Sequence, residues 1–156
     1  MRKEYPDAEF RLLGFLDVQN PAAISREQME QWVAEGVVRY MGTANDVRPY
    51  IADVNCMVLP SYREGVPRTL LEGAAMGRPI ITTDVVGCRE VVDDGVNGYL
   101  CQPRDSRDLA EKMIQMIELN GDQRAAMGLL GRNKVECEFD EKIVIQSYIQ
   151  AIRELT

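Results

Sequence analysis

The stretch SYREGVPRTLLEGAAMGRPIITT, residues 61–83, leads from one buried strand to the next through a helix. Just before it, residues 56–59 (CMVL) form a short apolar run closed by Pro60, which is typical of a strand buried on both faces. From Pro67 onward, leucines and alanines recur at helical spacing, and proline suits the first position of a helix. We therefore expect a strand at 56–59, a helix from Pro67 and a strand at 80–83.

The predicted start of this helix has no good capping residue. Val66 would occupy the cap position, and valine cannot accept hydrogen bonds from the free N–H groups of a first helical turn. Such a turn carries a partial positive charge and binds phosphate readily. The predicted anion site consists of the backbone donors of Arg68, Thr69 and Leu70, with Gly65 just before them allowing close approach of the backbone.

Two glutamates, Glu64 and Glu72, flank this predicted anion site with seven residues between them. Carboxylates repel an anion, but they accept hydrogen bonds from hydroxyl groups such as those of sugars. The pair therefore predicts a ligand with hydroxyl groups on both sides of an anionic centre. The alternative is a solvated helix start with two surface glutamates, and the spacing alone leaves it open.

The longer string of motifs resembles the donor-binding half of the family 4 (group 1) retaining glycosyltransferases, which have the GT-B fold. That family shows a strand, a Pro-Ser, two glutamates separated by seven residues, an alanine-rich helix, a Gly-x-Pro and another strand. The resemblance continues through an Asn-Gly turn and covers nearly the whole chain. The matching residues are Pro60-Ser61, Glu64, Glu72, Gly73 to Met76, Gly77 to Pro79, and residues 80–90 and 97–100.

The resemblance implies a role for each candidate residue. Glu72 would accept hydrogen bonds from the ribose hydroxyls, and Glu64, the candidate catalytic residue, would face the hydroxyls of the donor sugar. The backbone of the predicted anion site would hold the diphosphate. Met41 and Gly42, in a turn after another predicted strand, would contact the base through main-chain groups.

The implied reaction is transfer of a sugar from a nucleoside diphosphate, with UDP as the expected nucleotide, to a hydroxyl group, with retention at the anomeric carbon. The products would be cell-surface polysaccharide or lipid-linked oligosaccharide. The leaving phosphate would help to remove the proton of the acceptor, so catalysis would rest on positioning and on charge stabilisation. Besides the nucleotide-sugar co-substrate, the resemblance implies no cofactor and no metal, and the chain contains no Asp-x-Asp motif.

Apolar runs and helical patterns alternate along the chain, which predicts an α/β fold with a parallel, doubly wound, Rossmann-like sheet. Ligands of such folds bind at the carboxyl ends of the strands. The predicted strands lie at 9–15, 37–41, 56–59, 80–83 and 99–101, and the predicted helices lie at 26–35, 46–52, from 67 and near 90.

The end of the chain, about residues 106–155, is predicted to be helical. Asp140 caps the last helix, with Phe139 and Val144 placed to form a hydrophobic staple. An apolar stripe follows at helical spacing, and we expect it to pack within the domain. The alternative is that part of it is exposed, because the last helix of GT-B enzymes crosses back to the amino-terminal domain. The residues of the stripe are Ile145, Tyr148, Ile149 and Ile152.

Composition places the chain among globular proteins. Its 156 residues are 46% hydrophobic and 28% charged, which suits a single domain, and a net charge of −7 argues against general nucleic-acid binding. The absence of histidine removes Ser-His-Asp, Cys-His and most zinc sites. With no signal peptide and no membrane-spanning run, we expect the cytoplasm, and membrane contact only indirectly, at the inner face, through a full-length enzyme. The cysteines, predicted to be buried thiols, are Cys56, Cys88, Cys101 and Cys137.

The start of the chain departs from the pattern of the family. Family members have an acceptor domain, then a strand and a helix with an arginine and a lysine that grip the donor diphosphate, and these would lie before residue 1. We therefore expect residues 1–156 to be a single nucleotide-sugar donor-binding domain, a fragment that is inactive alone and needs the missing N-terminal acceptor domain. Two alternatives stay open: a non-catalytic nucleotide-binding domain of the same architecture, and a GT-B relative such as a nucleotide-sugar epimerase or a phosphorylase.

Overall fold

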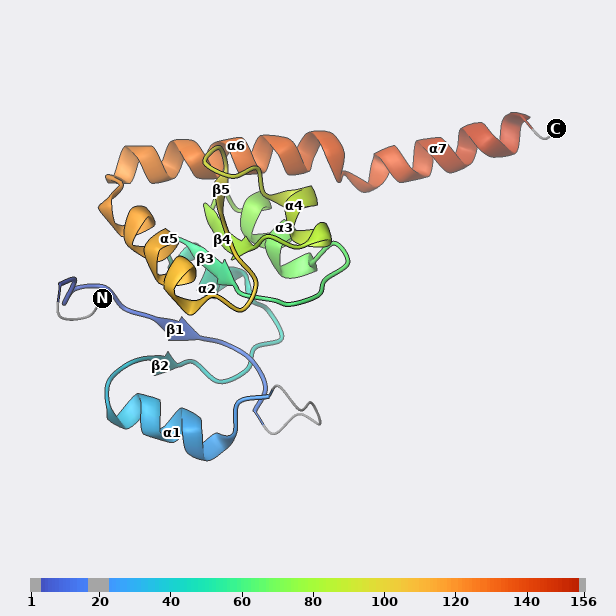
Figure 1. The fold of residues 1–156 in the computed structure, drawn as a ribbon. Helices are drawn as coiled ribbons and strands as arrows, with labels where there is room; N and C mark the ends of the chain where they lie inside the picture. Colours follow the sequence, from blue (N-terminus) through green and yellow to red (C-terminus); the bar gives the residue numbers. More distant parts are fainter. Residues whose placement is uncertain (1–3, 17–22, 155–156) are drawn as a thin grey trace. The chain divides into compact units, whose positions relative to one another are not determined.

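The computed structural model describes residues 4–16 and 23–154. The chain divides into two compact units, residues 1–47 and 48–156. Strands and helices alternate along the chain (Figure 1), so the predicted α/β fold is confirmed. The strands are parallel, and their hydrogen bonds form two sheets, one in each unit, where the sequence predicts one. Among the described residues, no helix has both the length and the apolar character needed to span a membrane.

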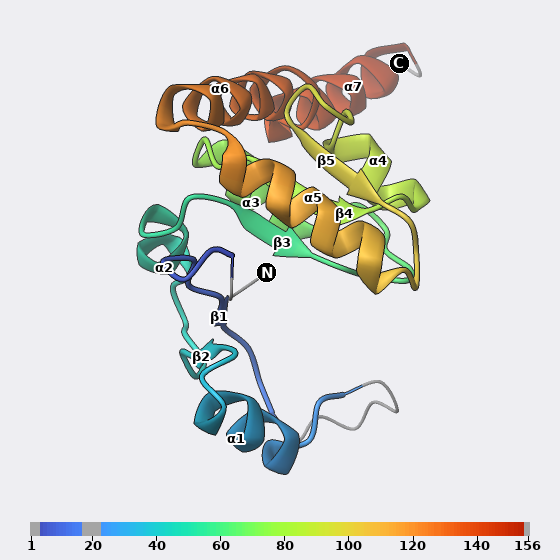
Figure 2. The ribbon, with the colours of Figure 1, turned by 60° about the vertical axis from the view of Figure 1, so that its left-hand side comes forward.

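Within residues 4–16 and 23–47, the first unit contains two short parallel strands and one helix (Figure 2). Ser25 caps the helix by accepting a hydrogen bond from the N–H of Gln28 at 3.1 Å. The predicted strands and helix are present, and each is shorter than predicted. The elements are β1 (Arg11–Leu12), α1 (Arg26–Ala34) and β2 (Arg39–Tyr40).

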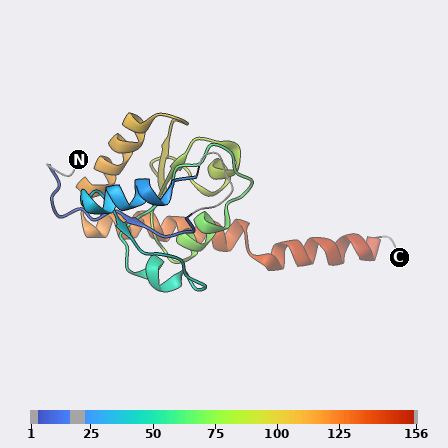
Figure 3. The same cartoon turned by 90° about the horizontal axis from the view of Figure 1, so that it is seen from below.

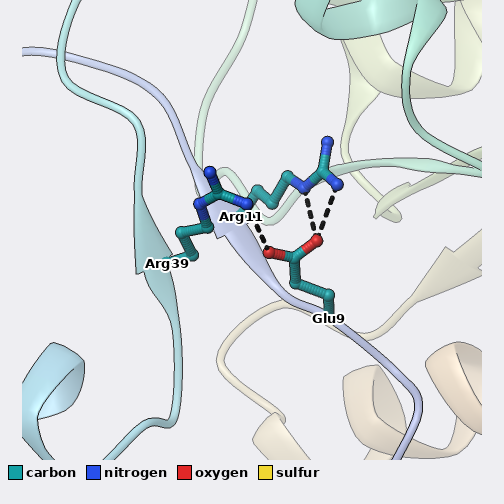
Figure 4. Close-up of polar contacts among 3 residues, drawn as sticks. All are labelled: Glu9, Arg11 and Arg39. Carbon is teal, nitrogen blue, oxygen red and sulfur yellow. Dashed lines mark hydrogen bonds and ion pairs between the residues drawn. The ribbon is translucent and has the colours of Figure 1, made fainter.

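An ion-pair cluster links the two strands of the first unit (Figure 4). Arg11 donates to Oε2 of Glu9 at 2.7 Å, and a second guanidinium nitrogen lies 2.6 Å from the same oxygen. Arg39, the register partner of Arg11 on β2, donates to Oε1 of Glu9 at 3.2 Å. The guanidinium of Arg11, and then that of Arg39, hold the pKa of the Glu9 carboxyl below its usual value. The chain's own arginines therefore occupy this carboxylate.

The second unit contains a three-stranded parallel sheet in the order β3-β4-β5, preceded by the short helix α2 (Arg48–Ala52). The middle strand is buried along its whole length. Because the strands are parallel, their carboxyl ends share one edge, and the loops that follow them meet there. The strands, close to their predicted bounds, are β3 (Met57–Leu59), β4 (Ile80–Thr83) and β5 (Gly98–Cys101).

Helices cover both faces of this sheet. Leu70 and Val91 pack with Ile80 in a core on one face. Ile81, whose side chain points to the opposite face, packs with Met116 in a second core. Helix α6 (Gly121–Glu138) contributes to both cores, and besides it two helices lie on the first face and one on the second. They are α3 (Arg68–Ala75) and α4 (Val86–Val91) on the first, and α5 (Ser106–Glu118) on the second.

Helix α6 (Gly121–Glu138) has no separate counterpart among the predicted elements. A capping box begins it: Oδ1 of Asn120 accepts from the N–H of Gln123, and Oε1 of Gln123 accepts from the N–H of Asn120, both at 2.9 Å. This Asn-x-x-Gln spacing is a signal in the sequence that predicts a helix start. The predicted helical C-terminal segment is therefore present, and α6 lies between α5 and the last helix.

Two glycines inside α6 allow it to pack closely. A Cβ on Gly128 would lie 1.9 Å from the carbonyl oxygen of Gly77, in the turn before β4. A Cβ on Gly131 would meet the side chains of Ala74 and Asn97 at 3.7 and 3.6 Å. A glycine inside a helix costs about 1 kcal/mol relative to alanine, and at Gly128 the close approach explains why it is present. Helix α6 thus packs near the amino ends of β4 and β5, away from the edge where these strands end.

Helix α7 (Glu141–Glu154) follows α6 with only Phe139 and Asp140 between them (Figure 3). Oδ1 of Asp140 accepts from the N–H of Lys142 at 2.9 Å, as expected of the predicted cap. The expectation that the apolar stripe packs within the domain is wrong, because neither core of the described second unit includes an α7 side chain. Tyr148 of the stripe is 69% exposed. The side chain of Val144, in the predicted staple, lies outside the described residues.

The four cysteines are free thiols that differ in burial. Cys88 and Cys101 are buried, and burial raises the pKa of the partly buried Cys56 to about 12. Cys137 is exposed, so the prediction of a buried thiol is wrong there. The reason is helical geometry: Cys137 lies nine residues after Gly128, on the opposite face of α6.

Candidate functional site

The start of α3 has free donors of the kind expected for an anion site. Its cap residue is Pro67, one position after the predicted Val66, and no side chain caps the helix. Leu70 is not a free donor, because its N–H donates to the carbonyl oxygen of Pro67 at 3.0 Å and closes the first turn. The N–H groups of Arg68 and Thr69 have no hydrogen-bond partner within residues 4–16 and 23–154. Two amides, rather than the three predicted, are therefore free at this helix start.

The two predicted glutamates lie on either side of this start. Glu64 is partly buried in the loop between β3 and α3, and Glu72 is partly buried in the second turn of α3. Arg68 lies one turn before Glu72, at a spacing that often forms ion pairs. Among the described residues, however, neither carboxylate has an ion-pair or hydrogen-bond partner. Both carboxylates are therefore available to a ligand.

Gly87, in the first turn of α4, packs directly on the loop that carries Glu64. A Cβ on Gly87 would lie 1.3 Å from the carbonyl oxygen of Gly65 and 2.7 Å from that of Glu64. No side chain fits in this space, so the backbone of α4 supports the loop. Gly87 has no predicted role in the sequence, where the glycine itself is the only signal of this close approach.

Cys88 lies below the same loop. Burial raises the pKa of its thiol, a hydrogen bond with Thr82 lowers it, and the charge of Glu64 raises it further. Thr82 in turn donates to the carbonyl oxygen of Leu59, at the end of β3, at 2.8 Å.

Met41 and Gly42 belong to the first unit, where they follow β2. The N–H of Met41 donates to the carbonyl oxygen of Leu12 at 2.8 Å, and the carbonyl oxygen of Gly42 accepts from the N–H of Gly14 at 2.9 Å. Gly42 has a φ of 72°, in the left-handed region that favours glycine. The predicted turn at the end of this strand is therefore present, and hydrogen bonds join it to the loop after β1.

The structure brings the other predicted residues together at one helix start. They supply free N–H donors, which favour an anion, and free carboxylates, which favour hydroxyl groups. In the part of the chain that the structure describes, no group of three or more histidine, cysteine, aspartate or glutamate side chains is arranged to hold a metal ion. The residues brought together are Glu64, Gly65, Arg68, Thr69, Leu70 and Glu72.

A hollow of about 680 Å³ lies elsewhere in the second unit, beside the end of β5 and the start of α5. Five carboxylates line it together with Arg107 and Lys112, and this excess of negative charge disfavours an anion. Oδ2 of Asp108 accepts from the N–H of Gln102 at 2.6 Å, and Asp105 caps α5. Asp105 and Asp108 thus accept hydrogen bonds from the chain's own backbone. The start of α3 is therefore the better candidate site.

A comparison with protein families identifies the kind of protein that has these free amides and carboxylates at the start of α3. The family model described as glycosyl transferases group 1 matches residues 1–119. The chain belongs to the group 1 glycosyltransferases. The family recognised from the sequence is thereby confirmed, and the matched region contains the helix start with both glutamates.

A curated relative shows how much of a group 1 glycosyltransferase this chain represents. The chain is 31% identical over 145 residues to the N,N'-diacetylbacillosaminyl-diphospho-undecaprenol alpha-1,3-N-acetylgalactosaminyltransferase of Campylobacter jejuni. The match covers 92% of this chain and 36% of the relative. The chain thus spans about a third of the length of the curated relatives that it matches.

Solved glycosyltransferases share the fold of this group 1 chain. A variant of Staphylococcus aureus TarM, solved with UDP, superposes with a TM-score of 0.82 at 19% identity, over 96% of this chain and 30% of that one. The C-terminal domain of LpcC, a group 1 glycosyl transferase from Francisella tularensis, superposes with a TM-score of 0.75 at 22% identity, over 89% of this chain and 73% of that one. The predicted GT-B relationship is therefore confirmed at the level of the fold.

Proposed function

We propose that this chain is the donor-binding part of a glycosyltransferase that moves a sugar from a nucleoside diphosphate to a hydroxyl group. The observation that carries the proposal is the start of α3, where the free N–H groups of Arg68 and Thr69 lie between the free carboxylates of Glu64 and Glu72. A nucleoside diphosphate sugar has the same order of groups, with ribose hydroxyls and sugar hydroxyls on either side of an anionic diphosphate. The site and this class of ligand are complementary in charge and in hydrogen bonding.

Each glutamate serves one side of the donor in this proposal. Glu72 accepts hydrogen bonds from the ribose, and Glu64, the candidate catalytic residue, accepts them from the transferred sugar. Met41 and Gly42 contact the base through main-chain groups. This division predicts that the two carboxylates act on different parts of one ligand, so their substitutions separate nucleotide binding from sugar binding.

The diphosphate is held by backbone donors. The N–H groups of Arg68 and Thr69 bind it with the partial positive charge of α3, and Gly65 allows its close approach. The N–H of Leu70 contributes less than the sequence predicts, because it is bonded within α3. These donors meet increasing negative charge as the diphosphate leaves, and losing one donor of this kind typically slows a reaction about 100-fold.

In this scheme no side chain acts as the general base that removes the proton of the acceptor hydroxyl. In a transfer with retention, the departing phosphate takes the proton from the acceptor hydroxyl on the same face of the sugar. The chain then contributes by holding the donor in position for an acceptor bound by the acceptor domain, and positioning of this kind can supply roughly 7–11 kcal/mol in favourable cases. No resident cofactor takes part in this proposal.

The comparisons support a narrower choice of donor and acceptor. UDP bound to the TarM variant supports UDP as the nucleotide. The Campylobacter relative is named for an undecaprenol diphosphate acceptor, which supports synthesis of lipid-linked oligosaccharide or cell-surface polysaccharide. We place the reaction in the cytoplasm, at the inner membrane face, where an acceptor of this kind would be met by an enzyme that also contains an acceptor domain.

Titration calorimetry of this chain with UDP and GDP tests the proposal. Binding in the millimolar range or tighter is expected, because the free amides and carboxylates are already in place. Glu138→Ala is a matched control, since Glu138 is an exposed glutamate on α6 remote from the site in sequence. If neither UDP nor GDP bound, the proposal would be contradicted. Sugar transfer by this chain alone would contradict the need for an acceptor domain.

Metal removal tests the proposed chemistry. A full-length enzyme that contains this chain should keep its transferase activity in EDTA, because backbone donors rather than a cation would stabilise the leaving diphosphate. The measurement is the rate of UDP release with and without EDTA. Loss of activity that magnesium restores would show that a metal carries this role.

A further inference from the structure

A contact between Tyr62 and Arg104 joins the loop that carries Glu64 to the loop that follows β5. The guanidinium carbon of Arg104 lies 5.4 Å from the centroid of the Tyr62 ring, within the range of a cation–π interaction. Tyr62 follows β3 and Arg104 follows β5, and β4 lies between these strands in the sheet. The contact therefore spans the carboxyl end of β4. The views in Figures 1 and 2 both show the two loops near one another at this edge.

The backbone of Arg104 is unusual. Its φ is 62°, and no other non-glycine residue in the described ranges has a positive φ. This left-handed conformation is unfavourable for a residue with a Cβ, and glycine or asparagine normally occupies it. Strained backbone of this kind persists where the surrounding structure requires it, often beside functional sites.

No ion pair explains this strain. Within the described residues the Arg104 side chain has no carboxylate partner, although Asp105 is its neighbour in the chain and caps α5. Tyr62 itself is 61% exposed, so it fills no core. The contact that the strained residue makes is the one with Tyr62, and its effect is on the loop between β3 and α3.

We propose that the Tyr62–Arg104 contact positions Glu64 for the donor sugar, an inference that rests on the proposed function. The loop is held at Gly65 by the backbone of Gly87 and at Tyr62 by Arg104, and Glu64 lies between these two points. Glu72 is held by the hydrogen bonds of α3 instead. Loosening the contact therefore moves the carboxylate that faces the sugar and leaves the ribose and diphosphate groups in place.

Arg104→Gly is the decisive variant, because it removes the guanidinium and relieves the left-handed backbone. Its midpoint of thermal unfolding should equal or exceed that of the parent, so a loss of function cannot come from unfolding. Calorimetry with UDP, UDP-glucose and UDP-N-acetylglucosamine measures binding. We expect the tighter-bound of the two UDP-sugars to weaken about five-fold and UDP itself to change less than about two-fold.

Conservative variants separate positioning from a structural role. Arg104→Lys keeps a cation and Tyr62→Phe keeps the ring, so both should bind the UDP-sugar within about two-fold of the parent. Lys112→Met is the matched control, because Nζ of Lys112 lies 5.8 Å from the ring centroid of Tyr99 in a similar contact outside this loop. It should leave the ratio of UDP-sugar to UDP affinity unchanged.

Amide hydrogen exchange of the ligand-free chain gives a readout independent of ligand. Residues 61–66 should exchange faster in Arg104→Gly than in the parent and at the parent rate in Arg104→Lys. Unchanged UDP-sugar binding in Arg104→Gly, or an equal loss of UDP and UDP-sugar, overturns the positioning role while the proposed function stands. A parent chain that binds neither UDP nor a UDP-sugar overturns the proposed function and this inference with it.

Discussion

Helix starts in the second unit are of two kinds. At α5 and α6, the side chains of Asp105 and Asn120 accept the N–H groups of the first turn, so the chain satisfies its own donors. At α3 and α4, the cap residues Pro67 and Val85 offer no side-chain acceptor. The uncapped starts both follow strands at the edge where β3 and β4 end. Helices α3, α4 and α5 all begin near the edge where the strands end and ligands of parallel sheets bind, and of these three only α5 has a side-chain cap.

Among the substitutions at the uncapped helix starts, Gly87→Ala should have the largest effect on stability and on UDP binding. The new Cβ would overlap the carbonyl group of Gly65, so the loop and the start of α4 must separate, at a cost of about 3 kcal/mol in the free energy of unfolding. UDP binding should be lost with it. Chemical denaturation measures the first effect, and Gly121→Ala, in open space at the start of α6, should show neither.

Glu72→Ala should weaken UDP binding about ten-fold, which corresponds to about 1.4 kcal/mol. The reason is that a free carboxylate at an uncapped helix start is proposed to bind the ribose, which every nucleotide brings. Glu64→Ala should change UDP affinity less than about three-fold, because it faces the sugar that UDP lacks. Equal losses in calorimetry would contradict this division between the two glutamates.

Adding a cap at α3 should weaken UDP binding and leave stability almost unchanged, whereas removing the cap of α6 should lower stability and leave UDP binding unchanged. Both effects should be smaller than those above. Pro67→Ser supplies a hydroxyl that can accept the free N–H of Thr69, so UDP affinity should fall about three-fold with little change in stability. Asn120→Ala removes a cap and should cost about 1 kcal/mol of stability with UDP affinity unchanged. Calorimetry and thermal unfolding of both variants measure these effects. A Pro67→Ser variant with unchanged UDP affinity would show that the free amides do not bind phosphate.

The smallest effect concerns Glu9, whose carboxylate is occupied by the chain itself, unlike those at α3. Its pKa is held below 4.5 in the folded chain, mainly by Arg11 and then by Arg39. The ionised form therefore stabilises the fold above pH 4.5, and this stabilisation is lost as the pH falls through the folded pKa. Arg39→Met should lower the unfolding midpoint slightly at pH 6, and the difference from the parent should shrink as the pH falls through the folded pKa of Glu9. A difference that stays constant across this pH range would exclude the ion pair as its cause.

Local pattern predicts most of the second unit. The strand at 80–83 has its predicted bounds, and helix α3 begins one residue after the predicted position because Pro67 serves as the cap. The exposed stripe of α7 and the exposed Cys137 differ from prediction. Helical spacing shows that apolar residues share a face, but it does not show whether another element covers that face.

Some features of the candidate site can also be predicted from the sequence, and others cannot. The glutamates, the weak helix cap and the family string are visible in the sequence, and the family comparison confirms the last of these. The bond of the Leu70 N–H to Pro67 and the roles of Gly87 and Arg104 are not visible there. Each depends on backbone geometry or on contact between segments that are distant in the chain.

The sequence by itself determined the alternation of strands and helices, the family and the pair of glutamates at a helix start. These features depend on neighbouring residues, since periodicity, capping and turn preferences act over a few positions. Only the tertiary structure decided which amides are free and how the loop of Glu64 is held between Gly87 and Arg104. The physical reason is twofold: the local geometry of the folded backbone decides whether a bond such as that from Leu70 to Pro67 closes, and close packing such as that at Gly87 forms only when distant segments meet.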